Sequence, residues 1–262
     1  DDWTDEHLAD DGLSFDFNAS ERTYRIAIGG SEADVIGGSE AFDHSFGLGG
    51  TDEIGGGPED DVLRGDEDGD LLSGNEGRDL VDGGAGDDTL YGGAAADNML
   101  GREGDDRLDE GAGHSGIAGG PGDDTLVGGQ GPDAFIVDPT SGDDVVKDFT
   151  AGPGMFDHIA FLHLQWEDLK IEDTDRGVKI SWEPNGSVLL EGVWESELAQ
   201  DDFMFATSPD LPPGERDPAG PTNERSTPSK EGPEIDASDR HGHSSGKGDN
   251  ESLAEDDPVF GF

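Results

Sequence analysis

The sequence contains no cysteine and few basic residues. Its 262 residues include 15 lysines and arginines against 64 aspartates and glutamates, which gives a formal net charge of −49 at pH 7. Without cysteine the chain has no disulfide, no zinc–thiolate site and no thiol nucleophile. The strongly negative field repels nucleic acid and anionic lipid and attracts cations. We therefore expect cations as partners, and no nucleic acid.

Apolar residues are also scarce. Only 31% of the residues are hydrophobic, so an ordinary globular core is not expected. No run of about 18 apolar residues occurs, so we expect no membrane span. The first residues lack the basic start and the apolar stretch of a signal peptide, and the chain does not begin with methionine. We expect a processed form or a part of a longer protein.

Glycine and aspartate, in contrast, are abundant and follow a fixed register. From Gly29 to Ile136 the chain divides into twelve consecutive nine-residue units without an insertion. The first position is glycine, the sixth aspartate and the eighth apolar, each in eleven units; the exceptions are Glu110, Ser115 and Ser45. Composition alone does not produce such a register, so the repeat determines the architecture. The units read GGSEADVIG, GSEAFDHSF, GLGGTDEIG, GGPEDDVLR, GDEDGDLLS, GNEGRDLVD, GGAGDDTLY, GGAAADNML, GREGDDRLD, EGAGHSGIA, GGPGDDTLV and GGQGPDAFI.

Each unit predicts half of one coil of the chain. Glycine at the first position, and often at the fourth, permits positive φ and close backbone approach, so the first six residues are expected to form a turn. The last three place one apolar side chain between two outward neighbours, which is typical of a short strand. Two units bring the chain round to stack on itself, so twelve units make a solenoid of six coils, roughly 25–30 Å long. We predict an all-β fold, a parallel β-roll of about six coils.

Stacking places the sixth-position residues in two columns, one at each set of turns. Carboxylates one strand spacing apart repel each other unless a cation lies between them. Carboxylate and turn-carbonyl oxygens, without nitrogen or sulfur, are the ligands that Ca²⁺ prefers. A row of solvated surface charges is the alternative, but it does not require a nine-residue register. The first column comprises Asp34, Asp52, Asp70, Asp88, Asp106 and Asp124, and the second column Asp43, Asp61, Asp79, Asp97, Ser115 and Asp133.

The units resemble the glycine-rich nonapeptide of RTX (hemolysin-type) calcium-binding proteins, G-G-x-G-x-D-x-U-x. GGAGDDTLY at 83–91 and GGPGDDTLV at 119–127 match every defined position. The resemblance covers residues 29–136 and implies a β-roll with several calcium ions between stacked turns, held by sixth-position aspartates and turn carbonyls. The metal ligands that it implies are Asp34, Asp52, Asp70, Asp88, Asp106, Asp124, Asp61, Asp79, Asp97 and Asp133, with the turn residues Gly83, Gly86, Gly101, Gly104, Gly119 and Gly122.

The match to this pattern is uneven. Four first-column units keep both turn glycines together with the aspartate, whereas alanine or glutamate often replaces the fourth-position glycine in the second column. Unit 110–118 lacks both its leading glycine and its aspartate. We therefore predict tighter calcium binding along the column from Asp52 to Asp124. Around Ser115 we predict a weak or empty position.

The roll is expected to depend on its metal. One inward apolar side chain in nine residues buries little surface, and carboxylates stacked in columns repel each other. Without metal the segment should be largely unfolded. Calcium binding and folding would then be one event.

The segments on either side of the repeats differ in composition. Residues 1–28 contain two alternating runs that predict strands, either capping one end of the roll or remaining from a preceding domain. Residues 137–205 are richer in apolar residues and predict a β-strand C-terminal cap, with a hairpin turn at 184–186. This second segment is similar to the one that follows RTX repeats in secreted bacterial enzymes. Four of its aspartates are expected in solvated turns, with calcium ligation as the alternative: Asp143, Asp144, Asp148 and Asp157.

Residues 206–262 are rich in proline, serine, glycine and charge, and we expect them to be disordered. The ending at 256–262, acidic residues before an apolar tip, looks like the C-terminal export signal of RTX proteins, which implies the bacterial type I secretion machinery as a partner. Gly242-His243-Ser244-Ser245-Gly246 fits G-x-S-x-G, but a nucleophile elbow requires a strand before it and a helix after it. The polar flanks predict neither, and no third partner accompanies the pair His241 and His243. We expect the chain not to be an enzyme.

Three functions remain open at this point. The preferred one is a secreted, extracellular calcium-binding module that folds on Ca²⁺ after export, with affinities near roughly 10⁻⁴ M. The second is the C-terminal carrier part of an extracellular hydrolase or polysaccharide-modifying enzyme, with its catalytic domain upstream. The third is a structural or adhesive protein that binds polysaccharide or a cell surface, for which the aromatic residues Phe42, Tyr91 and Trp194 are the sequence hints.

Overall fold

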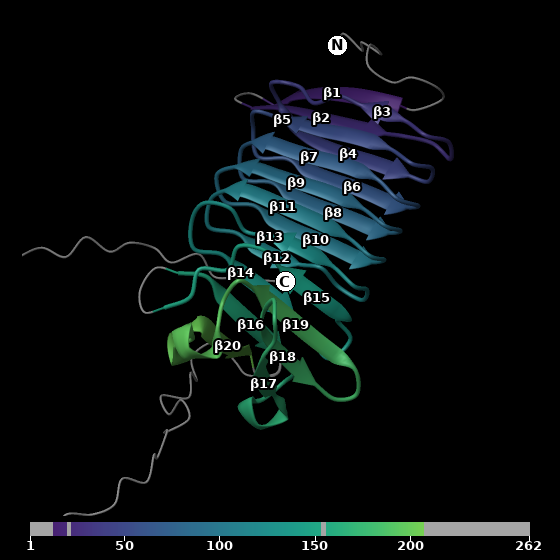
Figure 1. The fold of residues 1–262 in the computed structure, drawn as a ribbon. Coiled ribbons are helices and arrows are strands. Elements are labelled where there is room, and N and C mark those ends of the chain that lie inside the picture. Colours follow the sequence, from purple (N-terminus) through teal and green to yellow (C-terminus); the bar gives the residue numbers. More distant parts are fainter. Residues whose placement is uncertain (1–12, 20–21, 153–155, 207–262) are drawn as a thin grey trace, which may run out of the picture. The chain divides into compact units, whose positions relative to one another are not determined.

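Two ten-stranded β-sheets form the two walls of a roll (Figure 1). The computed structural model describes residues 13–19, 22–152 and 156–206. In order across it, sheet B contains β1 (Leu13–Ala19), β2 (Arg22–Ile28), β4 (Phe42–Leu48), β6 (Val62–Glu67), β8 (Leu80–Ala85), β10 (Asn98–Glu103), β12 (Gly116–Ala118), β14 (Ala134–Val137), β16 (His158–Leu162) and β20 (Phe203–Ala206).

Sheet A forms the opposite wall. In order across it, this sheet contains β17 (Lys170–Asp173), β18 (Gly177–Trp182), β19 (Gly186–Glu191), β15 (Asp143–Val146), β13 (Thr125–Val127), β11 (Arg107–Ala112), β9 (Thr89–Ala94), β7 (Leu71–Glu76), β5 (Glu53–Gly57) and β3 (Val35–Ile36). From β2 to β16 the chain alternates between the two walls, which is the path of a solenoid.

Strands within each wall pair in parallel at the spacing that the repeat predicts. Val62 in β6 lies opposite His44 in β4 and Leu80 in β8. Such partners are 18 residues apart, the same separation that hydrogen-bonded aspartates of successive coils show. Two nonapeptides therefore make one coil, and the predicted all-β parallel β-roll is confirmed.

Two rows of side chains, one from each wall, fill the interior between the sheets. The eighth-position residues of all twelve units are 0–1% exposed. They are Ile36, Ser45, Ile54, Leu63, Leu72, Val81, Leu90, Met99, Leu108, Ile117, Leu126 and Phe135. Ser45 is the polar exception, and its hydroxyl oxygen is buried without a hydrogen-bond partner. The narrow core explains why a single apolar residue per unit is sufficient.

The roll extends beyond the nonapeptides at both ends. β2 pairs in parallel with β4, with Tyr24 opposite Phe42, so it belongs to the coil before the first repeat. Beyond Ile136, β16 and β20 continue sheet B, and β15 and β19 continue sheet A. The solenoid consequently has about seven turns rather than six. The flanking segments extend the sheets themselves.

The C-terminal end contains the antiparallel hairpin that the sequence predicts. β18 and β19 pair from Gly177 opposite Glu191 to Trp182 opposite Gly186, and β17 adds a third antiparallel strand. The ring of Phe161 stacks on Phe205 with centroids 5.3 Å apart and meets the ring of Trp182 edge-on at 6.1 Å. Aromatic packing thus closes the core at this end.

Helical structure in the described residues consists of three single 3₁₀ turns, η1 (Trp166–Asp168), η2 (Glu195–Glu197) and η3 (Gln200–Asp202). Within this part of the chain, no helix has the length and apolar character required to cross a membrane. The predictions for residues 207–262, including the expected disorder, the G-x-S-x-G sequence and the export signal, lie outside the described residues.

Candidate metal sites

The sixth-position aspartates are buried although they are charged. All but Asp43, which lies in β4, come directly before a strand, and the aspartates of both columns are only 0–4% exposed. In the regular coils, Oδ1 of each aspartate accepts a hydrogen bond from the backbone N–H of the aspartate one coil earlier. The N–H of Asp52 donates to Asp70 at 2.7 Å, and the N–H of Asp70 donates to Asp88 at 2.7 Å. The columns are therefore hydrogen-bonded ladders that fix the register of the coils.

The other carboxylate oxygen, Oδ2, has no protein partner at most aspartates of the two columns. A buried carboxylate oxygen without a partner is costly, so the repetition of this arrangement calls for a compensating cation or proton. The buried, unpartnered Oδ2 atoms belong to Asp52, Asp61, Asp70, Asp79, Asp88, Asp97, Asp106, Asp124 and Asp133.

The first-position glycines leave open the space that these oxygens face. A Cβ atom on Gly65 would lie closer than 3.0 Å to both Oδ2 of Asp70 and the carbonyl oxygen of Gly83. A Cβ atom on Gly101 would meet Oδ2 of Asp106 and the carbonyl of Gly119 in the same way. Each missing side chain thus leaves a cradle lined by a carboxylate oxygen and a carbonyl oxygen.

Positive φ is required at other positions than the first. The first-position glycines do not have φ in the left-handed range, so the expectation that they serve by positive φ is wrong, and free space is their role. The second and fourth positions are left-handed instead, as at Gly84 (φ 121°) and Gly86 (φ 137°). Non-glycine residues occupy several of these positions at the cost of strain: Leu48, Asp66, Asn75 and Arg102 at the second, and Asp68 and Ala95 at the fourth.

Burial is the main influence on the acidity of the columns. Desolvation raises the pKa of the nine column carboxyls from Asp52 and Asp61 onward, and the backbone hydrogen bonds oppose this effect only in part. The pKa is raised to about 7 at Asp61, Asp70, Asp79 and Asp106, and to about 6 at Asp88, Asp97, Asp124 and Asp133. Near neutral pH the metal-free columns therefore hold protons that a cation can displace.

The donor set fits Ca²⁺. Carboxylate and carbonyl oxygens face the cradles, and hard oxygen donors of this kind suit calcium better than a transition metal. Among the described residues, no three aspartate, glutamate or histidine side chains converge on one point. Column carboxylates together with turn carbonyls would therefore hold each ion. The predicted aspartate ligands all lie in the two columns. Of the predicted turn residues, Gly83 and Gly101 lie in strands, in β8 and β10, and the other four lie outside strands: Gly86, Gly104, Gly119 and Gly122.

The chain itself supplies a partner at the N-terminal end of each column, although Oδ1 of Asp34 stays buried without a hydrogen-bond partner. In the first column, the N–H of Gly30 donates to Oδ2 of Asp34 at 2.6 Å. In the second, Arg25 stands opposite Asp43 in the parallel register. Its buried guanidinium forms an ion pair with Oδ1 of Asp43 at 3.2 Å and donates to the carbonyl of Gly37. Sequence reasoning missed Arg25, although its spacing from Asp43 could have identified it.

At the C-terminal end two aspartates continue the columns. Asp144 and Asp157 are 2% and 4% exposed, so the expectation of solvated turns is wrong for both. Asp144 accepts from the N–H of Asp124, and Asp157 from the N–H of Asp133. These partners are 20 and 24 residues apart, so short insertions take the two aspartates out of the nine-residue register. Asp143 is exposed, as expected.

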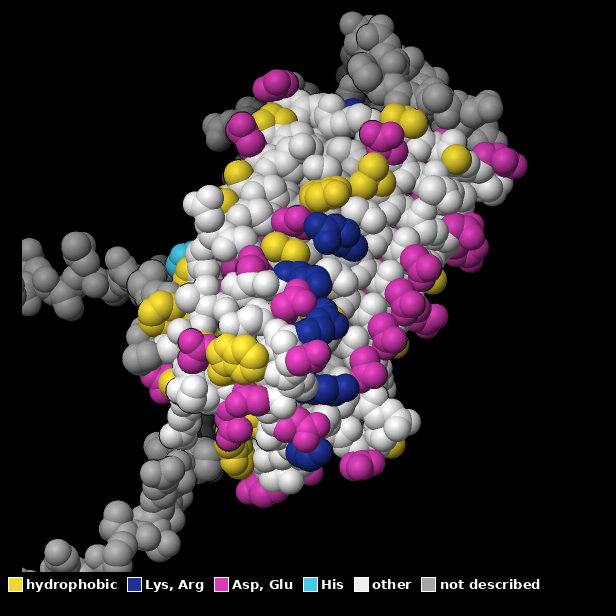
Figure 2. Space-filling view, in the orientation of Figure 1, with side chains coloured by type: hydrophobic (Ala, Val, Ile, Leu, Met, Phe, Trp, Pro, Cys, Tyr) yellow, Lys and Arg dark blue, Asp and Glu magenta, His cyan; other side chains and the backbone are white. Residues whose placement is uncertain are grey.

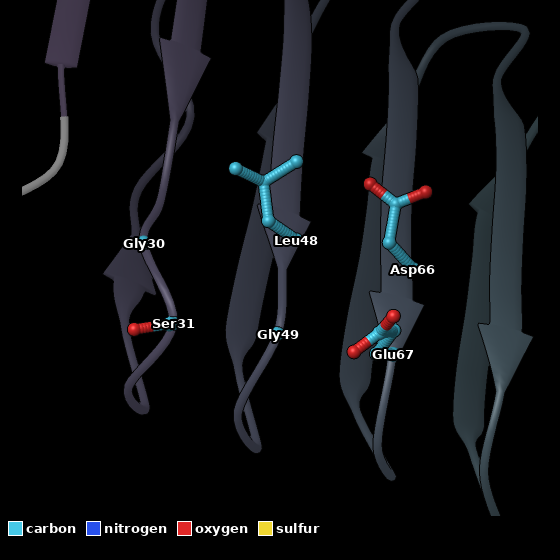
Figure 3. Close-up of a pocket in the computed structure, with 6 residues that line it drawn as sticks. All are labelled: Gly30, Ser31, Leu48, Gly49, Asp66 and Glu67. Atoms are coloured by element: carbon cyan, nitrogen blue, oxygen red, sulfur yellow. The ribbon is translucent and has the colours of Figure 1, made fainter.

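A surface pocket near the N-terminal end lies outside the columns. Figure 3 shows its lining, which comes from three successive coils: Gly30, Ser31, Leu48, Gly49, Asp66 and Glu67. These are second- and third-position residues, and none of the column aspartates is among them. The pocket therefore adds nothing to the metal sites.

The aromatic residues suggested for glycan binding lie apart. Phe42 is in β4 of sheet B, and its ring packs edge-on against Tyr24 with centroids 5.6 Å apart. Tyr91 is exposed on β9 of sheet A. The structure does not bring Phe42 and Tyr91 together on one wall.

Comparison with known proteins gives one family. Residues 46–81, 73–108 and 101–135 match the family model of the RTX calcium-binding nonapeptide repeat, which comprises four copies. No curated protein matches the chain.

Two solved structures are similar to parts of the chain. The extracellular lipase LipA from Serratia marcescens is 17% identical over 68% of this chain and 39% of the lipase chain, with a TM-score of 0.41. The AlgE6R3 subunit of the mannuronan C5-epimerase from Azotobacter vinelandii is 24% identical over 66% of this chain and 93% of that subunit, with a TM-score of 0.23. This chain thus spans 39% of the length of the lipase.

The register, the carboxylate ladders and the family match agree. The match begins at Phe46 and ends at Phe135, inside the twelve units that run from Gly29 to Ile136. Residues 46–135 are RTX calcium-binding nonapeptide repeats, and the chain carries an RTX calcium-binding module.

Proposed function

We propose that this chain is a secreted module that stays largely unfolded at low calcium and folds when it meets millimolar calcium outside the cell. The observation that carries the proposal is the repeated buried oxygen without a partner, at Oδ2 of nine column aspartates. Extracellular calcium-binding modules have dissociation constants of about 10⁻⁴ to 10⁻³ M. Sites in that range are empty in the cytoplasm and filled outside the cell.

Electrostatics supports the coupling of metal binding to folding. The coils bury one apolar residue per unit, while both columns bring carboxylates within one coil of each other. Without cations, burial of each charged carboxylate costs desolvation free energy, and neighbouring carboxylates repel each other. Folding then requires ions that bind only the native turns, so their binding free energy contributes directly to stability.

Circular dichroism during a calcium titration of the full chain tests this proposal. We expect a cooperative gain of β-structure near millimolar Ca²⁺. Mg²⁺ should not produce it, because this smaller ion requires near-octahedral geometry and sheds its water reluctantly. A chain that is already folded in chelator, or that responds equally to both ions, would contradict calcium-dependent folding.

Export is the second part of the proposal. An unfolded chain suits passage through a type I secretion channel, and the acidic and apolar ending at 256–262 resembles the signal that directs such export. Deleting these seven residues should retain the protein in cells that express the machinery. Deleting an equal length, 216–222, is the control and should leave export unchanged.

The third part is that the repeats have no catalytic role. Their carboxylates are committed to the ladders, and the proposed ligands are ions rather than a substrate. The purified chain is expected to hydrolyse neither ester nor polysaccharide test substrates, with or without calcium. Turnover that survives Glu and Asp substitution in the columns would point to a separate active site.

A further inference from the structure

Unit 110–118 departs from the repeat at two positions at once. Glutamate replaces the first-position glycine, and serine replaces the sixth-position aspartate. Both side chains are buried, with Glu110 0% and Ser115 3% exposed. They occupy the second column between Asp97 and Asp133.

Ser115 performs one half of the role of the missing aspartate. Its Oγ accepts a hydrogen bond from the N–H of Asp97 at 2.9 Å, where other column members use Oδ1. Its own N–H donates to Oδ1 of Asp133 at 3.0 Å. The backbone ladder therefore passes through this coil without a break.

Glu110 supplies the other half. Because it stands at the first position, its side chain starts where regular units leave the cradle open. Oε1 accepts a hydrogen bond from Oγ of Ser115 at 2.5 Å, while Oε2 is buried and has no hydrogen-bond partner. Regular column aspartates show the same pattern of one bonded and one unpartnered oxygen, as at Asp97.

The two substitutions are sterically linked. In the regular units of this column, a Cβ atom at the first position would lie closer than 3.0 Å to the aspartate Oδ2, as for Gly74 with Asp79 and for Gly92 with Asp97. A side chain at position 110 is therefore incompatible with aspartate at 115. Serine at position 115 lacks the carboxylate that would collide with this side chain, and Glu110 places its own carboxylate in the cradle.

We infer that Glu110 is a calcium ligand that, together with Ser115, replaces the aspartate of the regular repeat. The second column then binds cations without interruption, in place of the weak or empty position predicted from the sequence. This inference rests on the proposed function, because it assigns one more residue to the same kind of site. Its alternative is a buried glutamic acid that fills the cradle and excludes an ion.

Calcium counting on three variants of the full chain tests the assignment. Glu110→Gln preserves shape and removes the charge, Asp79→Asn does the same at a regular site of the same column, and Glu110→Gly with Ser115→Asp restores the consensus. Equilibrium dialysis should give at least one Ca²⁺ fewer per chain for Glu110→Gln and for Asp79→Asn. The double variant should bind the wild-type number.

The outcomes separate this inference from the proposed function. If Asp79→Asn loses calcium and Glu110→Gln does not, Glu110 is a filler and the inference fails alone. A double variant that binds more ions than wild type also overturns it, and this readout remains if Glu110→Gln does not fold. A wild-type chain that binds no calcium overturns the proposed function itself.

Discussion

At the residue scale, each position of the repeat sets its own limit on which side chain it accepts. The first position has no room for a Cβ atom, because a carboxylate and a carbonyl of the next coil face the same point, as at Gly65. The second and fourth positions require a left-handed backbone, which residues other than glycine adopt in some units, as at Ala95 (φ 85°). The consensus glycines therefore serve two different physical needs, and their replacements should differ in cost.

Gly65→Ala tests the steric need. The methyl group would collide with Asp70 and Gly83, so we expect a loss of about 2–4 kcal/mol in the free energy of unfolding in calcium. Gly55→Ala is the matched control, because its methyl group would meet no atom closer than 3.7 Å. Urea denaturation in millimolar calcium measures both. Equal effects of the two substitutions would show that the cradle tolerates a side chain.

Ala95→Gly tests the conformational need. Relief of the left-handed strain at an exposed alanine should raise the free energy of unfolding by about 1 kcal/mol. Ala94→Gly, at an exposed neighbour in β9 without positive φ, should instead lower it by about 0.5–1 kcal/mol. Urea midpoints in calcium compare the two variants. The same sign for both would contradict the assignment of strain to the fourth position.

At the scale of elements, each column is one electrostatic unit with distinct ends. Arg25 closes the second column by an ion pair with buried Asp43. At the other end, Oδ1 of Asp157 accepts from Asp133, and its Oδ2 accepts from the N–H of Thr150 at 2.7 Å. In the second column, the interior oxygens without partners therefore lie between ends that the protein satisfies itself.

Arg25→Gln should leave the carboxylate of Asp43 buried without its cationic partner. Removing one member of a buried ion pair costs about 3–5 kcal/mol, so we expect a loss in that range in calcium-saturated protein. Arg64→Gln, at an exposed position of β6, should change stability by less than about 0.5 kcal/mol. Thermal unfolding compares them. Wild-type stability of the Arg25 variant in calcium-saturated protein would contradict this prediction, because an ion would then have replaced the guanidinium.

Protons should partly replace calcium in the metal-free columns. The pKa of Asp70 and Asp79 is raised to about 7 and that of Asp97 to about 6, so between about pH 4 and 7 the folded chain binds more protons than the unfolded chain. The free energy of unfolding therefore falls as the pH rises through this window. In calcium-free buffer we expect more β-structure at pH 5 than at pH 8, measured by circular dichroism.

The affinity for calcium should depend on pH in the opposite direction to the metal-free stability, and rise with pH. Protons compete with Ca²⁺ for the column carboxylates, so the calcium midpoint should move to higher concentration between pH 8 and pH 5. A metal-free β-signal that increases with pH would contradict the assignment of raised pKa values to the columns.

The regular part of these elements was predictable from the sequence. The inward eighth position and the two aspartate columns follow from a period of nine residues, and the hairpin at 184–186 follows from local turn chemistry. Features that depend on contacts between coils were not predictable in this way. Insertions take Asp144 and Asp157 out of the nine-residue period. In the sequence Glu110 is only a missing glycine, and its hydrogen bond to Ser115 depends on the folded coil.

At the scale of the whole molecule, the roll combines buried and exposed acidic ladders. Figure 2 shows acidic side chains following one edge of the roll, with a line of basic side chains on the adjoining face. At the turns, exposed Asp87 and Asp105 accept the backbone N–H groups of Asp105 and Asp123, at 3.0 and 2.9 Å. With a net charge of −49, self-repulsion opposes the compact state unless cations are bound.

Hydrogen–deuterium exchange of the full chain, in chelator and in millimolar calcium, tests most directly whether calcium holds the roll together. The backbone N–H groups of Asp52 and Asp70 donate to the next aspartate in the ladder, so their protection reports the column itself. We predict slow exchange across residues 29–136 in calcium and fast exchange across the same residues in chelator. Equal protection in both conditions would contradict the account, because the carboxylate columns would then be stable without the metal.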